Sequence, residues 1–248
     1  MNDKKKGVIA VLMVFFPMAC MAQGEDDGPL GFVYSTYHIC NVATQDQLDE
    51  VVAEHDKPVM DKAVKDGRMT GWGYYSHMTG GQWRKLQYHT AATIQEVLHN
   101  QETIFAEIYE GNEEAGKMRG GACWGHDDYI WAVMNGNPPN TGGDDPKSSL
   151  SVYYECDFMR EDNADQIVAS AHAPVLNKLV ADGKLDSWGW LAHRVGGKYR
   201  RLQTFTGESH EQVLAARGAL LQATGGPQGL GFGEICGSHT DYLWDIVH

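Results

Sequence analysis

Side chains that could take part in chemistry occur twice in this chain, in the same order and at the same spacing. Arginine can bind a carboxylate or phosphate through two parallel hydrogen bonds, and histidine can donate or accept a proton near neutral pH. A buried glutamine amide needs hydrogen-bond partners and can orient a ligand. Large aromatic side chains stand nearby. The candidate ligand-binding residues are therefore His77, Arg84, Gln87, His193, Arg200, Gln203, Trp72 and Trp190.

A second recurring pattern places histidine and aspartate two positions apart, as His126 with Asp128 and as His239 with Asp241. On a strand such residues point to the same face, so the aspartate could orient the histidine as a general base or metal ligand. A zinc site needs three or four ligands, and this pattern supplies two. No Ser-His-Asp order, Walker loop, GxGxxG or HExxH motif occurs. We expect neither a metal nor a cofactor, and the catalytic residues stay unassigned.

The candidate residues lie on two predicted hairpins, 70–87 and 187–203, each turning at a Gly-Gly pair. Glycines permit the positive φ of tight hairpin turns. With a two-residue loop, His77 lies opposite Arg84, Tyr75 opposite Leu86 and Tyr74 opposite Gln87. The second hairpin likewise pairs His193 with Arg200, Leu191 with Leu202 and Trp190 with Gln203. Each hairpin then has a His/Arg/Leu face and a Trp/Tyr/Gln face. The paired His and Arg could clamp an anion, or form a structural cluster at the hairpin end.

The predicted elements follow one order in both halves: strand, helix, two hairpin strands, helix, strand. In the first half, the strand, helix, hairpin, helix and strand span about 32–40, 45–65, 70–90, 93–109 and 123–133. Around the second hairpin, the strand, helix, helix and strand span about 151–158, 164–181, 209–223 and 234–247. Glycine-rich loops are expected at 110–121 and 225–233. Pro58 and Pro174, 116 positions apart like His77 and His193, should interrupt the first helix of each half. We interpret this pattern as an internal repeat.

A βαββαβ unit is the ferredoxin-like arrangement, an antiparallel sheet with both helices on one face. At this point the chain resembles the dimeric α/β-barrel superfamily in its fused form, over residues 31–134 and 150–248. The resemblance implies an α+β fold of two tandem ferredoxin-like repeats whose antiparallel sheets pack together, joined by a linker at 135–149. Such a chain would be a monomer that forms an intramolecular pseudo-dimer. The aromatic Trp72, Tyr74, Trp188 and Trp190 would then fill the interface between the sheets.

Residues 1–22 are expected to be a signal peptide. Three lysines precede the apolar run 7–19, and small residues precede a cleavage point before Gln23. Lipoprotein anchoring at Cys20 is the minor alternative. Without this segment, 17 basic and 32 acidic residues remain of 20 and 33, a net charge of −15. Such a charge disfavours nucleic acid as a partner. We expect an exported, periplasmic or secreted protein without a transmembrane segment after cleavage.

Four cysteines remain, Cys40, Cys123, Cys156 and Cys236, an even number that is typical of disulfides in exported proteins. In a split βαβ unit the first and last strands are neighbours, which pairs Cys40 with Cys123 and Cys156 with Cys236. Aligning Val33 with Val152 places Cys156 three residues away from the Cys40 position. The two bridges then cannot share one geometry unless a bulge shifts a strand.

Three functions remain open. The first is an exported small-molecule-binding or accessory protein of unknown ligand. The superfamily resemblance implies the second, a cofactor-independent monooxygenase or isomerase, or a haem-dependent enzyme. No catalytic motif of any subfamily is present, so no functional residue is transferred. The third is a structural or interaction module.

Overall fold

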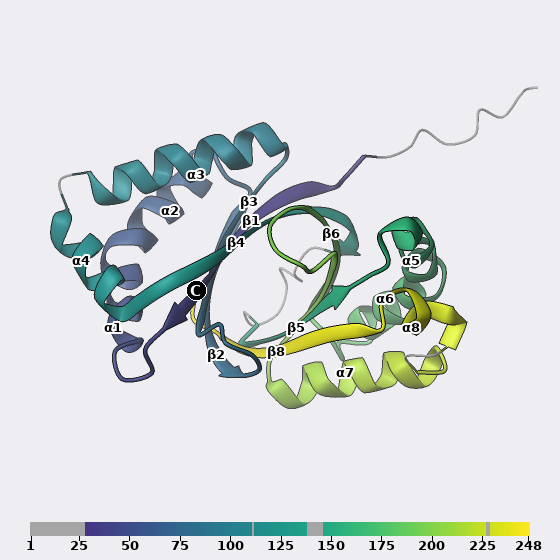
Figure 1. Cartoon of the computed structure of the whole chain (residues 1–248). Helices are drawn as coiled ribbons and strands as arrows, with labels where there is room; N and C mark the ends of the chain where they lie inside the picture. Colours follow the sequence, from purple (N-terminus) through teal and green to yellow (C-terminus); the bar gives the residue numbers. More distant parts are fainter. Residues whose placement is uncertain (1–27, 111, 138–145, 227–228) are drawn as a thin grey trace, which may run out of the picture.

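The protein is a closed barrel of eight antiparallel strands, flanked by two groups of helices (Figure 1). This computed structural model describes residues 28–110, 112–137, 146–226 and 229–248. The strands follow the order β1-β3-β2-β8-β5-β7-β6-β4, and β4 closes on β1. Their bounds are β1 Gly31–Cys40, β2 Gly71–Thr79, β3 Lys85–Ala91, β4 Cys123–Asn137, β5 Ser148–Glu155, β6 Ser187–Val195, β7 Arg201–Gly207 and β8 Ser238–Ile246.

The expected fold, two ferredoxin-like sheets packed face to face, is wrong. Strand β2 pairs with β8, and β4 pairs with β6, so the strands of both halves belong to one closed sheet. An unpaired edge strand exposes backbone N–H and C=O groups, and closure of the barrel pairs them. The inner faces of all eight strands therefore surround one shared interior.

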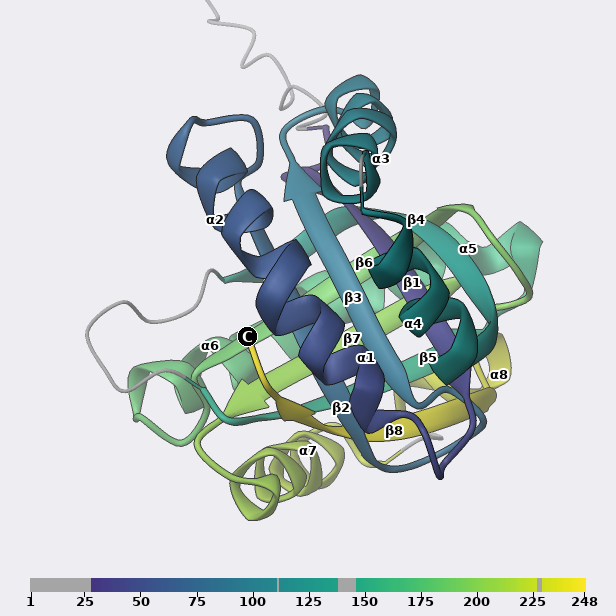
Figure 2. The same ribbon diagram turned by 90° about the vertical axis from the view of Figure 1, so that its left-hand side faces the viewer.

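The helices cover the outside of the barrel in two groups on opposite sides (Figures 1 and 2). The first group comprises α1 Asp46–Val51, α2 Lys57–Lys65, α3 Ile94–Tyr109 and α4 Glu113–Ala122. The second comprises α5 Glu161–Ile167, α6 Ala173–Ala181, α7 His210–Ala223 and α8 Phe232–Ile235. A π-helical segment joins α1 to α2 (η1, Val52–Asp56) and α5 to α6 (η3, Val168–His172). Pro58 and Pro174 lie in the first turn of the following helix. A backbone N–H in that turn has no partner within the helix, so its absence in proline costs little.

Two segments expected to be loop or strand are helical. Residues 113–122 form α4, because Asn112 caps it by accepting a hydrogen bond from the Ala115 N–H and Glu113 and Glu114 occupy its first turn. Residues 232–235 form α8, and β8 begins at Ser238 rather than at position 234. Glycines in both segments suggest a loop, whereas α4 is stabilised by its cap and α8 by the burial of Phe232 and Ile235.

The four hairpin aromatics expected between the sheets, Trp72, Tyr74, Trp188 and Trp190, contact the helices instead. Nε1 of Trp72 donates to Asp61 of α2 at 2.9 Å, and the Tyr74 hydroxyl donates to Asp49 of α1 at 2.7 Å. In the other half, Trp188 and Trp190 likewise donate to Asn177 of α6 and Asp165 of α5. The prediction that these four side chains lie between two sheets is wrong. Alternation along a strand shows which residues share a face, but not which face the helices cover.

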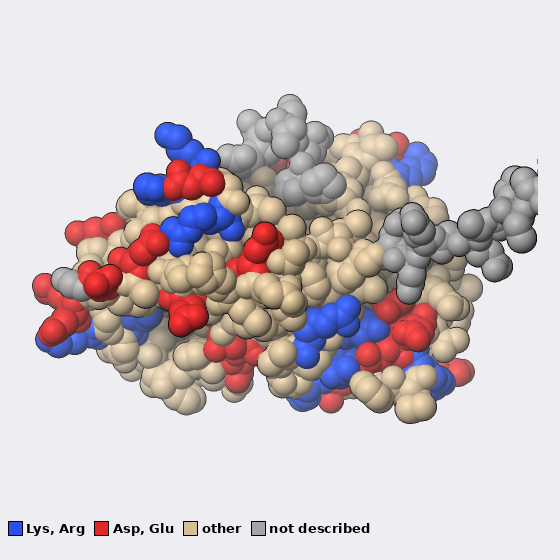
Figure 3. All heavy atoms as spheres, turned by 90° about the horizontal axis from the view of Figure 1, so that it is seen from above, with Lys and Arg blue, Asp and Glu red and all other residues tan. Residues whose placement is uncertain are grey.

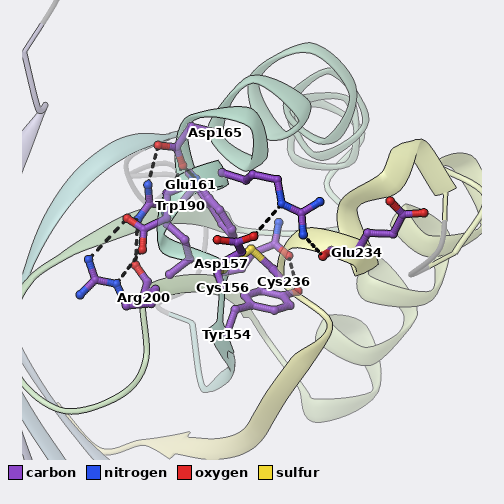
Figure 4. Close-up of a disulfide and its surroundings, with 12 residues drawn as sticks. Tyr154, Cys156, Asp157, Glu161, Asp165, Trp190, Arg200, Glu234 and Cys236 are labelled. Atoms are coloured by element: carbon purple, nitrogen blue, oxygen red, sulfur yellow. Dashed lines mark hydrogen bonds and ion pairs between the residues drawn. A yellow bond between two sulfur atoms is a disulfide. The ribbon is translucent and has the colours of Figure 1, made fainter.

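Both predicted disulfides are present, Cys40–Cys123 and Cys156–Cys236. Figure 4 shows the second. The expected three-residue mismatch between them is wrong. His38 pairs with Lys85 as Tyr154 pairs with Arg201, so β1 and β5 correspond at a separation of 116 residues. At that separation Cys156 corresponds directly to Cys40. The register of β1 against β4 also shifts at Cys40, where a bulge brings it opposite Cys123.

Surface charges are mixed rather than separated by sign. On the face shown in Figure 3, acidic and basic side chains lie next to each other over the helices. Within the described ranges no helix is long and apolar enough to cross a membrane. The predicted signal peptide, Cys20, and residues 138–145 of the predicted linker lie outside the described residues. The ends of that linker belong to β4 and β5.

Candidate functional site

The predicted hairpin register is confirmed. Tyr74 pairs with Gln87 in the first hairpin, and Trp190 pairs with Gln203 in the second. The backbone N–H of His77 donates to the carbonyl of Arg84 at 2.9 Å. The structure therefore divides the eight candidate ligand-binding residues between two faces of the sheet.

The histidine and arginine of each hairpin bind each other near its turn. Nδ1 of His77 lies 2.6 Å from a terminal nitrogen of the Arg84 guanidinium. The Nε of Arg84 donates to the side-chain oxygen of Gln45 at 2.9 Å. Burial, and then the positive charge of Arg84, lower the pKa of His77. Since the arginine donates to Gln45 as well, this cluster connects the hairpin to the start of α1.

The second hairpin uses a carboxylate in the same place. Nδ1 of His193 lies 2.8 Å from Arg200, and Arg200 Nε lies 2.6 Å from Glu161 of α5. Glu161 also binds Arg201 at 2.9 Å; Figure 4 shows Glu161 beside Arg200. Burial and the Arg200 charge lower the pKa of His193. Arg200 is thus already paired with an acidic group of the chain.

The glutamines lie on the opposite face, beneath the helices. Nε2 of Gln87 donates to the fully buried Asp56 at 2.9 Å, and Asp56 also forms an ion pair with Arg119 of α4. Gln203 is 1% exposed, and its Oε1 accepts from the Tyr154 hydroxyl at 3.4 Å. Of the eight candidate residues, Trp72 alone lines the main cavity described below.

One end of the barrel is filled by aromatic side chains. Tyr129 stacks on Trp131 with ring centres 4.9 Å apart, and Tyr242 stacks on Trp244 at 5.0 Å. We call this group the aromatic plug; its members are Tyr37, Trp83, Tyr129, Trp131, Tyr153, Tyr199, Tyr242 and Trp244. All are at most 8% exposed, so the plug closes this end of the interior.

The rest of the interior is a cavity of about 1100 Å³. Buried serines line one part of its wall, Ser35, Ser149 and Ser151, each at most 3% exposed. Further hydroxyl groups come from Tyr75, Tyr88, Thr90, Thr204 and Thr206. Aliphatic side chains complete the wall, among them Val33, Val133, Leu86, Leu191, Leu202 and Ile246. The wall is therefore mainly apolar, with scattered hydrogen-bonding groups, as is typical of small-molecule sites.

Two tyrosines form a hydrogen-bonded pair inside this cavity. The hydroxyl oxygens of Tyr75 and Tyr88 lie 3.2 Å apart, and their rings meet edge to face. Burial raises the pKa of both phenols. The corresponding positions across β6 and β7 are Leu191 and Thr204, so the cavity has a phenolic side and an aliphatic side. Both phenols stay protonated; one donates to the other, and the second can donate a hydrogen bond to a ligand.

The charged residues of the cavity lie at its open end. Lys57 and Asp61 of α2 form an ion pair at 2.6 Å, with 40% and 50% of their side-chain surface exposed. Lys147 and His248 also line this end. In the part of the wall that the structure describes, a ligand inside the barrel would therefore meet hydroxyl and apolar groups, with charged groups only at the entrance.

The two His-x-Asp pairs lie on the surface. Nδ1 of His126 is 3.0 Å from Asp128, and Nδ1 of His239 is 2.8 Å from Asp241. The predicted sharing of one strand face is therefore confirmed. Among the residues that the structure describes, no three His, Cys, Asp or Glu side chains converge in a way that could hold a metal ion.

Sequence reasoning missed the cavity residues because they are small or aliphatic. Ser35, Ser149 and Ser151 alternate with residues that face the helices, so the period of two could have placed them on the inner face. Chemical reactivity draws attention to charged and large aromatic groups. In this fold these groups mostly hold the helices against the barrel and close one end of the barrel.

A haem group does not fit the site. Haem iron needs an axial imidazole, thiolate, thioether or phenolate. In the described wall of the barrel cavity the only imidazole is His248, at the entrance. Burial raises the pKa of the four phenols in the wall, Tyr37, Tyr75, Tyr88 and Tyr153, and so disfavours a phenolate ligand. No step of a reaction is therefore assigned to haem.

Solved structures with this fold include enzymes. A candidate monooxygenase from Fusobacterium nucleatum subsp. nucleatum is 6% identical, with a TM-score of 0.60 over 89% of this chain and 94% of that one. An anthrone oxidase-like protein is 12% identical, with a TM-score of 0.54 over 90% and 93%. A mutant chlorite dismutase from Candidatus Nitrospira defluvii is 8% identical, with a TM-score of 0.56 over 89% and 92%. At these identities the likeness concerns the fold, which is the dimeric α/β-barrel fold. No protein-family model and no curated protein sequence matches the chain.

Proposed function

We propose that this protein binds an uncharged, largely apolar small molecule inside the barrel. The observation that carries the proposal is the cavity of about 1100 Å³, whose interior wall is aliphatic and hydroxyl-bearing. Ligand pockets commonly range from about 300 to 1000 Å³, so the space is ample. A charged ligand inside the barrel would lose its hydration without a countercharge, because the charged residues of the described wall lie at the entrance. A neutral molecule would lose little, and the Tyr75 and Tyr88 hydroxyls could fix its orientation.

A fluorescence titration with N-phenyl-1-naphthylamine, a neutral aromatic probe, tests the binding. The probe should brighten and saturate at one molecule per chain. Ser151→Phe places a ring into the cavity from a residue that is 2% exposed and should weaken binding at least tenfold. The matched variant Ser151→Ala keeps the space and should bind within about fivefold of wild type, since a hydrogen bond contributes roughly 1 kcal/mol. Equal binding by all three proteins would refute a site in the barrel.

A second candidate is an oxidase that acts in the same cavity without a bound cofactor. The fold it shares with a candidate monooxygenase and an anthrone oxidase-like protein supports this proposal. The balanced reaction to test is anthrone plus O₂ giving anthraquinone plus water. Oxygen uptake and anthraquinone absorbance should rise with wild type and fall to the uncatalysed rate with Ser151→Phe. Binding of the neutral probe without oxygen uptake would leave the binding function and remove the oxidase for this substrate.

We further propose that the protein is exported. The two disulfides support this, because such bonds persist mainly in oxidising compartments. N-terminal sequencing of the protein from its host should find Gln23 first. A start at Cys20 would indicate the lipoprotein instead, and an intact N-terminus with free thiols would contradict export.

A further inference from the structure

A second, smaller cavity lies on the outer side of the barrel in the second half of the chain. Its volume is about 40 Å³, and it shares no lining residue with the barrel cavity. Strand residues Tyr154 and Gln203 form one wall, and helix residues His172, Arg217 and Phe232 form the other. A water molecule needs about 10–15 Å³ in this measure, so the space holds a few waters or one small ion.

Two buried polar side chains in this cavity lack a hydrogen-bond partner. Gln203 is 1% exposed, and its Nε2 donor has no acceptor. His172 is 7% exposed, and its Nδ1 is also unpaired. A buried polar group without a partner costs about 1–3 kcal/mol, and such groups in native proteins usually have a bound partner. The unpaired amide donor of Gln203 therefore calls for an acceptor in this cavity.

The first half of the chain shows what that acceptor is in the equivalent place. Gln87 pairs with Tyr74 as Gln203 pairs with Trp190, so the two amides occupy matching positions. Asp56 ends η1 as His172 ends η3. In the first half Nε2 of Gln87 donates to the carboxylate of Asp56. The second half has an imidazole at that position, and an empty volume beside an unpaired amide donor.

The charges around the cavity suit an anion. Arg217 of α7 lines it with a side chain that is 15% exposed, and its guanidinium lies 3.7 Å from Asp241. Asp241 is shared, because it also binds His239. Burial lowers the pKa of His172 to about 4, so its imidazole is neutral near pH 7 and one ring nitrogen carries a proton to donate.

We propose that this cavity binds one small monovalent anion, a halide or a formate-sized carboxylate, that takes the place of the Asp56 carboxylate. The anion accepts hydrogen bonds from Gln203 Nε2 and from the protonated ring nitrogen of His172, and Arg217 supplies the positive charge. The cavity volume excludes nucleotides, sugars and haem. The site is structural or regulatory for the second group of helices and independent of the barrel cavity.

Bromide is the probe, because its anomalous X-ray scattering identifies it directly. Crystals of the full chain grown without halide and soaked in sodium bromide should show an anomalous peak beside Gln203 Nε2. His172→Asp supplies the carboxylate found in the first half and should remove the peak. The matched control, His99→Asp, changes an exposed histidine of α3 and should retain it.

A solution measurement covers variants that do not crystallise. At constant ionic strength, bromide in place of the larger gluconate should raise the unfolding temperature of wild type and of His99→Asp. The bromide affinity of His172→Asp should fall at least tenfold. If that variant does not fold, the same fall is expected for Arg217→Met. A wild-type cavity that contains only water, or a peak that persists in the aspartate variant, would overturn the proposal.

Discussion

Gly81 lies directly against the hydroxyl of Tyr242, so close that a Cβ atom at this position would overlap the phenol oxygen. The same phenol oxygen lies 3.4 Å from the backbone nitrogen of Trp83. In the other half, Gly197 lies in the same way against Tyr129. Each Gly-Gly turn thus lies over a tyrosine of the opposite half and covers the aromatic plug. The first glycine of each turn, Gly80 or Gly196, adopts a positive φ angle, and the second allows the backbone to lie against the tyrosine.

Gly81→Ala should lower the free energy of unfolding by about 1–3 kcal/mol, the usual effect of forcing an extra carbon against packed side chains, here the buried Tyr242. The φ angle of Gly81 is not positive, so the effect is one of space. The control is Gly116→Ala in α4, where nothing lies within 4 Å of the added carbon. That variant should be more stable by up to about 1 kcal/mol, as alanine favours helix. Urea unfolding of both variants measures the difference; equal effects would contradict the close approach.

A buried ion pair gives the second prediction. Lys85 is 1% exposed, and its Nζ lies 2.6 Å from Asp49 of α1. Asp49→Asn leaves this ammonium group buried without a countercharge and should lower the free energy of unfolding by about 3 kcal/mol. Glu113→Gln is the control, because its ion pair with Lys117 is 3.8 Å long and both side chains are more than 75% exposed. That change should stay within about 0.5 kcal/mol in the same denaturant series.

The sequence predicts the local structure well, but it predicts the pairing of the strands into one sheet less well. Alternation along the strands and the Gly-Gly pairs were enough to place Tyr74 opposite Gln87 and Trp190 opposite Gln203. Local patterns do not say which edges pair, so the bonding of β2 to β8 and of β4 to β6 was missed.

The site was harder to predict than the fold. The chemistry of His77 and Arg84 predicts a ligand site, but the structure joins the two side chains to each other and to Gln45. The cavity exists where the inner faces of the eight strands carry no large side chains. This can be seen only once the strands are known to form one closed barrel. Ser149 and Ser151 line it because their neighbours point to the helices, and nothing about serine itself predicts a site.

The buried histidine of β1 predicts a dependence of stability on pH. Burial first, and then the charges of Arg119 and His126, lower the pKa of His38 to about 3. In the unfolded chain its pKa is about 6.5. Between these values the unfolded state binds the extra proton, so stability is complete above about pH 7 and falls as the pH falls toward 3. His38 should account for about 3–5 kcal/mol of that loss.

Urea unfolding at intervals from pH 7 to pH 4 measures this contribution. His38→Gln cannot take up the proton and should lose stability less steeply than wild type on acidification. His99→Gln, at an exposed position of α3, should follow wild type throughout. The carboxylates contribute equally to all three proteins and cancel in the comparison. Parallel curves for wild type and His38→Gln would show that His38 does not resist protonation.

The disulfides give the last prediction. They join Cys40 to Cys123 and Cys156 to Cys236, with sequence separations of 83 and 80 residues. Closing loops of this length restricts the unfolded chain and should stabilise the protein by around 4 kcal/mol for each bond. Replacing Cys156 and Cys236 together by serine removes one bond without leaving a free thiol. This variant and the matching change at Cys40 and Cys123 should lose similar amounts of stability, because their loops are nearly equal. Peptide mapping without reductant should recover both pairs within their own halves; a bond between the halves, or four free thiols in exported protein, would contradict them.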